Sequence, residues 1–136
     1  GTQIIGTFAF SDCETLTRIP LPNSVTSIEF RTFTCCTALT DINIPEGVTN
    51  IEDETFADCF ALTGISLPDS VTSIGSGAFN CCSMLTNLSI PDCVTYIGRA
   101  AFSDCSNLTL IVGHHTYAAQ YAEENNIPYA FPASDS

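Results

Sequence analysis

Leu85–Asn107 reads LTNLSIPDCVTYIGRAAFSDCSN, and the stretch before it, Leu62–Met84, reads LTGISLPDSVTSIGSGAFNCCSM. The two segments align without a gap over 23 residues each. Leu16–Ala38 and Leu39–Ala61 have the same length and the same pattern, so four complete units follow one another. Self-similarity at a fixed period of about 20–50 residues is typical of solenoid proteins.

Reading the units in register gives columns of like residues. Leucine opens each unit, two apolar columns and a proline follow, and later columns hold valine, isoleucine, phenylalanine and cysteine. The first apolar column is Ile19, Ile42, Ile65, Leu88 and Ile111, and the second is Leu21, Ile44, Leu67, Ile90 and Val112. The aromatic column is Phe10, Phe33, Phe56, Phe79 and Phe102. The sulfur column is Cys13, Cys36, Cys59, Cys82 and Cys105.

The spacing within one unit predicts its local structure. The Ile-x-Ile/Leu-Pro step has a period of two, which indicates a short strand with one buried face, and proline ends it because it has no N–H to donate. Val-Thr-x-Ile predicts a second extended stretch, and the Ala/Thr–Phe–Cys segment suits a single helical or 3₁₀ turn. One unit cannot bury its own apolar side chains, whereas stacked units can. The sequence therefore predicts an α/β repeat solenoid of about five coils, roughly 25 Å long at ~4.8 Å per coil.

At these columns the sequence resembles the BspA-like leucine-rich repeat family, whose unit reads roughly L-t-x-I-x-I-P-x-x-V-t-x-I-g-x-x-A-F-x-x-C-x-x. The resemblance covers about Ile4 to Phe131. It implies a right-handed superhelix. It also implies an extracellular protein, such as the bacterial and protozoan surface proteins of this family that adhere to host proteins or other microbes. A fold of this kind carries sites that vary independently of it.

The two ends of the chain depart from the repeat. Thr116 is a plausible N-cap, and Tyr117 and Tyr121 lie four residues apart, as on one face of a helix that covers the last coil. Residues 1–15 match only the second half of a unit, so we expect them to be a truncated half-repeat. The predicted organisation is a half-repeat at 1–15, a solenoid at 16–112 (16–38, 39–61, 62–84, 85–107 and a partial unit at 108–112), a C-terminal cap at 113–131 and a tail at 132–136.

Composition excludes several classes of partner. The chain has 136 residues, of which 45% are hydrophobic, and a formal net charge of −12 with three arginines and no lysine. Nucleic acids and anionic membrane surfaces require a basic patch, which this chain lacks. No apolar run approaches the ~18 residues of a membrane span, so we expect contact with a membrane only through regions outside this chain.

The eight cysteines permit two interpretations. Eight cysteines in a short secreted chain usually indicate disulfides. Five of them, however, recur at the repeat period, which favours a buried column of free thiols. Stacked neighbours would lie within the Cα range of a disulfide, but their parallel Cβ vectors give poor geometry. Cys35, Cys81 and Cys93 lie outside this column, and none of the eight has the paired spacing of a zinc site.

No constellation for catalysis or metal binding stands out. His114 and His115 are adjacent, so on an extended segment they point to opposite sides. The run Glu52-Asp53-Glu54, with Asp58 beyond it, could supply oxygens to Ca²⁺ but lacks the alternating form of a calcium loop, so a solvated run is favoured. Catalysis needs an asymmetric, converging set of groups, which a periodic sequence does not offer. We predict no catalytic, cofactor-binding or metal-binding residue and no enzymatic activity.

Function in a solenoid resides on its exposed columns. The candidate partner-binding residues are Arg18, Asp41, Asn43, Ser66, Asn87, Ser89 and Tyr96. These groups are mostly small and polar and include few of the large anchors of binding hot spots. The sequence therefore predicts a protein-binding or adhesion module that binds a host or microbial surface protein weakly and multivalently. The alternative is a structural stalk or spacer, or a segment that self-associates through its open N-terminal end at Ile4–Phe10.

Overall fold

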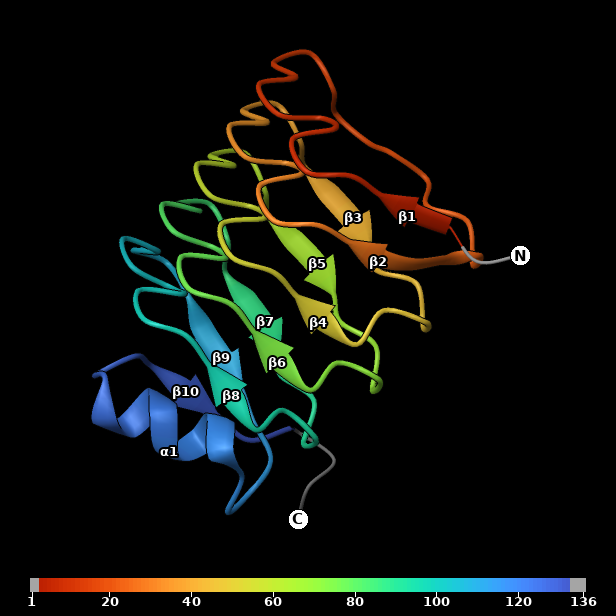
Figure 1. The fold of residues 1–136 in the computed structure, drawn as a ribbon. Helices are drawn as coiled ribbons and strands as arrows, with labels where there is room; N and C mark the ends of the chain where they lie inside the picture. The colour runs from red at the N-terminus through yellow and green to blue at the C-terminus, as the bar shows by residue number, and fades with distance from the viewer. Residues whose placement is uncertain (1–2, 133–136) are drawn as a thin grey trace.

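In the computed structural model, which describes residues 3–132, each unit forms one coil and the coils stack along a single axis (Figure 1). One row of strands, here called the first sheet, consists of two hydrogen-bonded groups that follow one another along the stack. The first group is β3 (Asp41–Asn43) with β5 (Gly64–Ser66), and the second is β7 (Asn87–Ser89), β9 (Thr109–Ile111) and β10 (Tyr129–Ala130). A second row, here called the second sheet, likewise consists of two groups, β1 (Gln3–Ile5) with β2 (Val25–Ile28), and β4 (Asn50–Ile51), β6 (Ser73–Ile74) and β8 (Tyr96–Ile97). All strand pairs are parallel, because each strand pairs with the equivalent strand of a neighbouring coil.

The predicted aromatic column forms one continuous stack through the core. Ring centroids of successive phenylalanines are 5.4, 5.5, 5.5 and 5.6 Å apart, with interplanar angles of 10° or less. Phe33, Phe56 and Phe79 are fully buried. The rings are therefore parallel and spaced at nearly equal distances, as expected for identical residues that lie in register on successive coils. The expectation that like side chains meet like through the interior is confirmed.

The number of coils is larger than the predicted five. The first sheet has a bridge between Arg18 and Asp41 at one end and β10 at the other, so it has six rungs: the Arg18 bridge, β3, β5, β7, β9 and β10. The additional rung is β10, whose Ala130 pairs with Ile111. The sequence around Tyr129–Ala130 lacks the repeat pattern, and backbone pairing with β9 alone makes it a strand.

The predicted helical turn of each coil is absent from residues 3–132; turns replace it. Each coil places two residues four positions apart in the left-handed region, as at Glu54 (φ 54°) and Asp58 (φ 61°). A right-handed helix cannot accommodate positive φ. Backbone N–H groups of this segment donate to the next coil, as from Phe56 to Ala78 at 2.8 Å. The segment thus forms a third row of hydrogen bonds between coils, and the one helix of the described chain is at the C-terminal end.

The strand register differs from the predicted columns in the last unit. Leu110, and not Ile111, lies opposite Leu88 and is fully buried, while Ile111 is opposite Ser89 and half-buried. The one-residue shift is already present at Thr109, which lies opposite Asn87, so it begins earlier than the columns indicated. Because side chains alternate along a strand, this shift exchanges the inward and outward residues of β9.

Helix α1 (Tyr117–Glu124) covers the C-terminal end of the stack. Thr116 is its N-cap, as predicted, because its hydroxyl accepts a hydrogen bond from the Ala119 N–H at 3.1 Å. Tyr121 packs edge-on against Phe102 and donates its hydroxyl to the Gly98 carbonyl at 3.1 Å. The helix thus supplies the contacts that a further coil would make. Of the predicted tail at 132–136, only Pro132 lies within the described residues. Of the predicted half-repeat at 1–15, residues 3–15 are described.

Candidate partner-binding surface

Six of the seven predicted binding residues share the outer side of the first sheet, here called the first-sheet face. Its members are Arg18, Asp41, Asn43, Ser66, Asn87 and Ser89, and all are exposed. They flank buried residues such as Ile42 and Leu88, so the alternation of the strand presents them to solvent. The pairing of Asn43 with Ser66 shows that these residues follow one another in register along the stack.

The first-sheet face is hollowed at both ends. Near the N-terminal end, Arg18, Pro20, Asp41 and Asn43 line a hollow of about 410 Å³. Arg18 Nε lies 3.3 Å from an Asp41 carboxylate oxygen, with 76% and 52% of the two side chains exposed. An ion pair this open to water contributes little to stability, so both charges remain accessible to a partner.

The second hollow of this face lies toward the C-terminal end and has a volume of about 480 Å³. Its lining includes Ser89 together with the apolar residues Ile90 and Ile111 and the acidic residue Asp92. Its lining thus combines apolar side chains with polar and acidic ones. That composition fits a peptide segment better than it fits a small polar molecule.

Tyr96, the seventh predicted residue, is separated from the other six. It lies on β8 of the second sheet, where it pairs with Ser73, and its side chain is 53% exposed. Tyr96 lies near Tyr121 of α1. Burial raises the pKa of the Tyr121 hydroxyl, and the nearby Tyr117 and Tyr96 raise it further. The structure therefore assigns Tyr96 to the C-terminal end of a different sheet, and it does not extend the first-sheet face.

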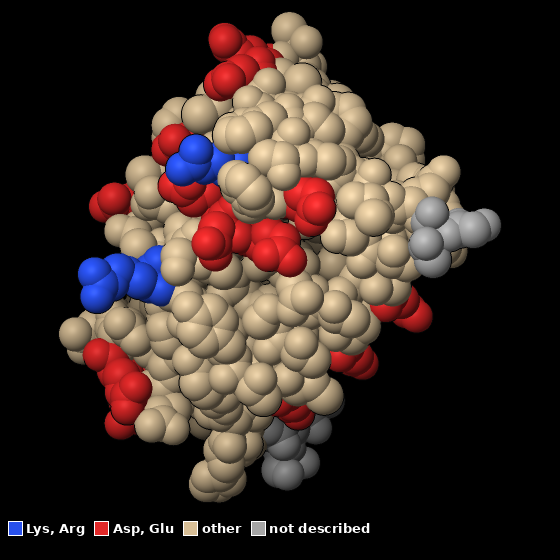
Figure 2. All heavy atoms as spheres, viewed as in Figure 1, with Lys and Arg blue, Asp and Glu red and all other residues tan. Residues whose placement is uncertain are grey.

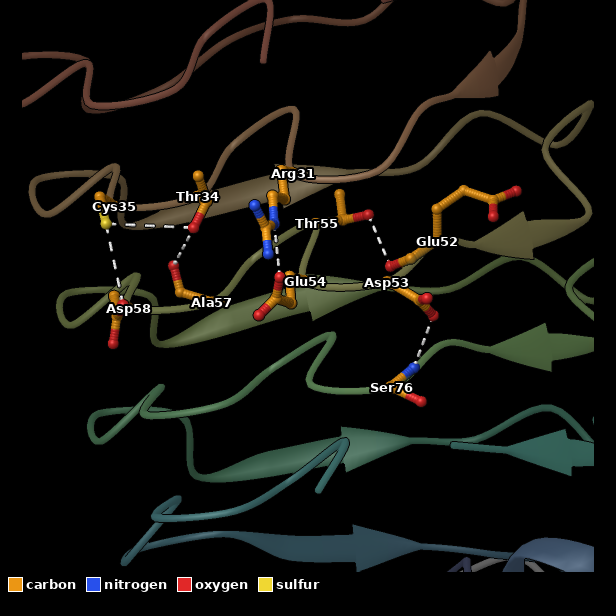
Figure 3. Close-up of polar contacts among 10 residues, drawn as sticks. All are labelled: Arg31, Thr34, Cys35, Glu52, Asp53, Glu54, Thr55, Ala57, Asp58 and Ser76. Carbon is orange, nitrogen blue, oxygen red and sulfur yellow. Dashed lines mark hydrogen bonds and ion pairs between the residues drawn. The ribbon is translucent and has the colours of Figure 1, made fainter. Parts of the chain in front are cut away.

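The acidic run Glu52-Asp53-Glu54 does not converge on one point. Asp53 Oδ1 accepts a hydrogen bond from the Ser76 N–H at 2.8 Å, and Glu54 pairs with Arg31 of the preceding coil (Figure 3). Burial and the nearby Glu29 raise the pKa of Glu52. No cluster of metal-ligating side chains capable of holding an ion is found within residues 3–132. Figure 2 shows that acidic residues recur over much of this view of the molecule, with basic residues at few places.

The predicted sulfur column is a row of free thiols inside the stack. The thiols of Cys36, Cys59, Cys82 and Cys105 each donate to a phenylalanine carbonyl of the preceding coil, at 3.0–3.1 Å. Burial raises the pKa of Cys59 to about 12 and that of Cys36 and Cys105 to about 11. Thiols that keep their protons are poor nucleophiles, so this row serves packing and hydrogen bonding.

A second column alternates aspartate and cysteine along the turn segments: Asp12, Cys35, Asp58, Cys81 and Asp104. All five residues have positive φ, between 60° and 64°. The Cys35 thiol lies 3.8 Å from Asp58, and the Cys81 thiol lies 3.9 Å from Asp104. Burial and the flanking carboxylates raise the pKa of both thiols. The sequence shows the spacing of this column, but only the backbone angles explain why aspartate, which tolerates the left-handed region, recurs there.

The two histidines lie at the C-terminal end. Their ring centroids are 6.3 Å apart, and His114 stacks on Phe131 at 3.6 Å. His115 has a positive φ of 62°, so the turn directs the two rings differently. The two residues form a turn before α1 and not an extended segment, and His114 joins an aromatic cluster that the repeat pattern does not indicate.

Residues 1–121 match the family model of the BspA type leucine rich repeat region, in six copies. The chain belongs to this family. The match spans more than four fifths of the chain and includes every coil that carries the phenylalanine stack. No curated protein sequence matches the chain.

Solved structures of bacterial leucine-rich repeat proteins have the same fold. A leucine-rich repeat protein from Bacteroides ovatus superposes with a TM-score of 0.77 at 40% identity, over 81% of this chain and 28% of that one. The T. pallidum leucine rich repeat protein superposes with a TM-score of 0.76 at 37% identity, over 79% of this chain and 50% of that one. A leucine rich cell surface protein from Faecalibacterium prausnitzii superposes with a TM-score of 0.76 at 43% identity, over 81% of this chain and 29% of that one. This BspA-type chain thus spans half or less of the length of each of these proteins.

The described part of this BspA-type chain contains no helix with the length and apolar character needed to cross a membrane.

Proposed function

We propose that this chain is a non-enzymatic protein-binding module of a cell-surface or secreted protein, and that it binds through the first-sheet face. The observation that carries the proposal is the register of that face. Polar side chains from adjacent rungs project in parallel from a rigid sheet, and hollows lie at both ends. Membership of the BspA-type family and similarity to a protein described as a cell surface protein support the location.

The chemistry of the first-sheet face favours weak contacts that are repeated. Asn43, Ser66 and Ser89 form one column of small polar groups, and Arg18 is the one residue of the face that belongs to the types enriched in hot spots. Such a face gives low affinity per module. Several modules acting together on a surface raise the apparent affinity by about 10²–10⁴ without new contacts.

The test compares one copy of the chain with many. The chain is measured against a panel of host extracellular proteins, first as a soluble monomer and then coupled at high density to beads. We expect micromolar or weaker binding by the monomer and retention on beads that is stronger by at least a factor of about 100. Nanomolar binding by the monomer would contradict weak, multivalent binding.

A pair of matched variants locates the surface. The triple change Asp41→Ala, Asn43→Ala and Asn87→Ala removes groups from the first-sheet face. The control removes Thr49, Asn50 and Thr95, which are exposed on or beside the second sheet. We expect bead retention to be lost in the first variant and kept in the second. Loss in the control alone would place binding on the second sheet.

A second function is a stalk that self-associates through the N-terminal end. One observation favours it: Ile4, Phe8 and Phe30 are 67%, 48% and 47% exposed at that end. Apolar side chains gathered at one place favour association. Sedimentation distinguishes the two functions, because end-to-end association raises the mass with concentration, and Phe8→Ser with Phe30→Ser abolishes that rise. A strict monomer at millimolar concentration would exclude the stalk that self-associates.

A further inference from the structure

A groove of about 570 Å³ lies between helix α1 and strand β10, outside the first-sheet face. We call it the cap groove. Its lining includes His114, His115, Glu123, Glu124, Tyr129 and Phe131. Four of these residues carry aromatic or imidazole rings, which are linked by ring contacts, and two carry carboxylates from the last turn of the helix. Neither the repeat columns nor the predicted cap accounts for this combination.

The rings of the cap groove form a fixed cluster. His114 stacks on Phe131 with 24° between the rings and 3.6 Å between their centroids. Tyr129 packs edge-on against Phe131, with 6.1 Å between the ring centroids and 73° between the ring planes. Tyr129 and Phe131 remain 37% and 42% exposed. Because the rings of Tyr129 and Phe131 stand at a steep angle to one another, they border the groove on two sides. Aromatic cages that bind cations have rings arranged in this way.

The carboxylates of the cap groove are held near these rings. Tyr129 donates its hydroxyl to Glu123 Oε2 at 3.4 Å, and Gln120 donates to Glu124 Oε2 at 3.0 Å. Each of these bonds uses one oxygen of a group that has two. The arginine–carboxylate pairs of residues 3–132 are Arg18–Asp41 and Arg31–Glu54, which lie on coils at the other end of the solenoid. Negative charge in the groove is therefore not neutralised by an arginine of the described chain.

We propose that the cap groove binds a lysine side chain presented by a partner protein. The aliphatic stem of the lysine lies along Phe131 and Tyr129, and its ammonium group lies between the Glu123 and Glu124 carboxylates. This arrangement combines apolar contact along the stem with charge and cation–π attraction at the tip. The site is separate from the first-sheet face, so either proposal can fail without the other.

The charge of the whole molecule favours a basic partner over a neutral ligand. The net charge is −12, and no lysine of the chain competes for the groove. A large net negative charge attracts basic segments at long range and accelerates their association. A neutral oligosaccharide would also stack on Phe131, but it would gain nothing from the net charge and little from two ionised carboxylates.

The test is an NMR titration of the full chain with two peptides, acetyl-Gly-Lys-Gly-amide and the same peptide carrying Nε-acetyllysine. We expect the lysine peptide to shift ring resonances of Tyr129 and Phe131 with millimolar affinity, and the acetylated peptide to bind at least fivefold more weakly. The double variant Glu123→Gln and Glu124→Gln should weaken the lysine peptide about five- to tenfold. Phe131→Ala should weaken it about threefold.

The matched control removes the same charge elsewhere. Glu14→Gln with Glu46→Gln changes two exposed carboxylates of the N-terminal half, and we expect less than a twofold change in affinity. Equal weakening by the two double variants would show attraction to the net charge alone and would overturn the site. Equal binding of the two peptides would also overturn it, as would binding of a neutral disaccharide that depends on Phe131 but not on Glu123 and Glu124.

Discussion

The two ends of the solenoid carry the same columns of residues but bury them to different extents. At the N-terminal end Phe10 and Leu16 are only half-buried, whereas at the C-terminal end Phe102 and Leu108 are 6% and 3% exposed. The difference is helix α1, whose Tyr121 packs against Phe102. A coil therefore contributes apolar side chains that become buried only when a neighbour covers them, and the helix acts as the neighbour of the last coil.

The largest expected effect compares two members of the phenylalanine stack. Phe56 is stacked on both sides, so Phe56→Ala should lower the free energy of unfolding by about 3–5 kcal/mol. Phe10 is stacked on one side among the described residues, so Phe10→Ala should lower it by only about 1–2 kcal/mol. Urea unfolding followed by circular dichroism measures both. Equal losses would show that burial by two neighbours is not what stabilises a coil.

The second test makes the C-terminal end resemble the N-terminal one. Tyr121→Ala removes the ring against Phe102 and the hydrogen bond to Gly98, and we expect a loss of about 2 kcal/mol. Tyr121→Phe keeps the ring and should lose only about 1 kcal/mol. Thermal unfolding by calorimetry gives both values. A loss in Tyr121→Phe as large as that in Tyr121→Ala would mean that the hydroxyl, and not the ring, closes the end.

The third test uses alkaline pH on the sulfur row. Burial raises the pKa of Cys59 from 9.0 to about 12, so the folded chain keeps a proton that the unfolded chain loses above pH 9. The contribution of Cys59 to the free energy of unfolding is therefore fully present below pH 9. It falls by about 1.4 kcal/mol per pH unit as the pH rises toward 12. Cys59→Ala should remove that part of the slope in urea unfolding between pH 9 and 11. An unchanged slope would contradict a buried, protonated Cys59.

The smallest of these effects concerns the start of the covering helix. Thr116→Ala removes the hydroxyl that accepts the Ala119 N–H and should lower the free energy of unfolding by about 1 kcal/mol. Thr116→Ser keeps the hydroxyl and serves as the control. If both variants lose the same amount in chemical unfolding, the cap hydrogen bond does not contribute.

The columns of the sequence predicted the interior well because packing there depends on size and period alone. Phe33, Phe56 and Phe79 recur every 23 residues, and stacking follows directly from that period. The family resemblance drawn from the same columns is also correct. The first-sheet face could be located for the same reason, since a residue between two buried positions of a strand points outward.

Other features depended on backbone conformation and on contacts without a periodic pattern. The left-handed turn residues include Cys35 and Ala100, which give no sign of positive φ in a sequence. Gly77 is the one glycine at these positions (φ +64°) among residues 3–132. Tyr96 occupies the variable place of the Val-Thr-x-Ile step, so the sequence already places it on the second extended stretch, apart from the other six candidate residues. The cap groove forms through a strand, β10, that the repeat does not encode.

The stacking of mutually dependent coils is tested most directly by native-state hydrogen exchange resolved by residue. We predict that amide protection rises from the N-terminal coil, at Phe10 N–H, to the central coils, at Phe56 and Phe79 N–H. We also predict that it stays high at the C-terminal end, at Leu110 N–H, which donates to the Pro128 carbonyl. Protection at Phe10 as strong as at Phe56, or a fall at Leu110 to the level of Phe10, would contradict the account.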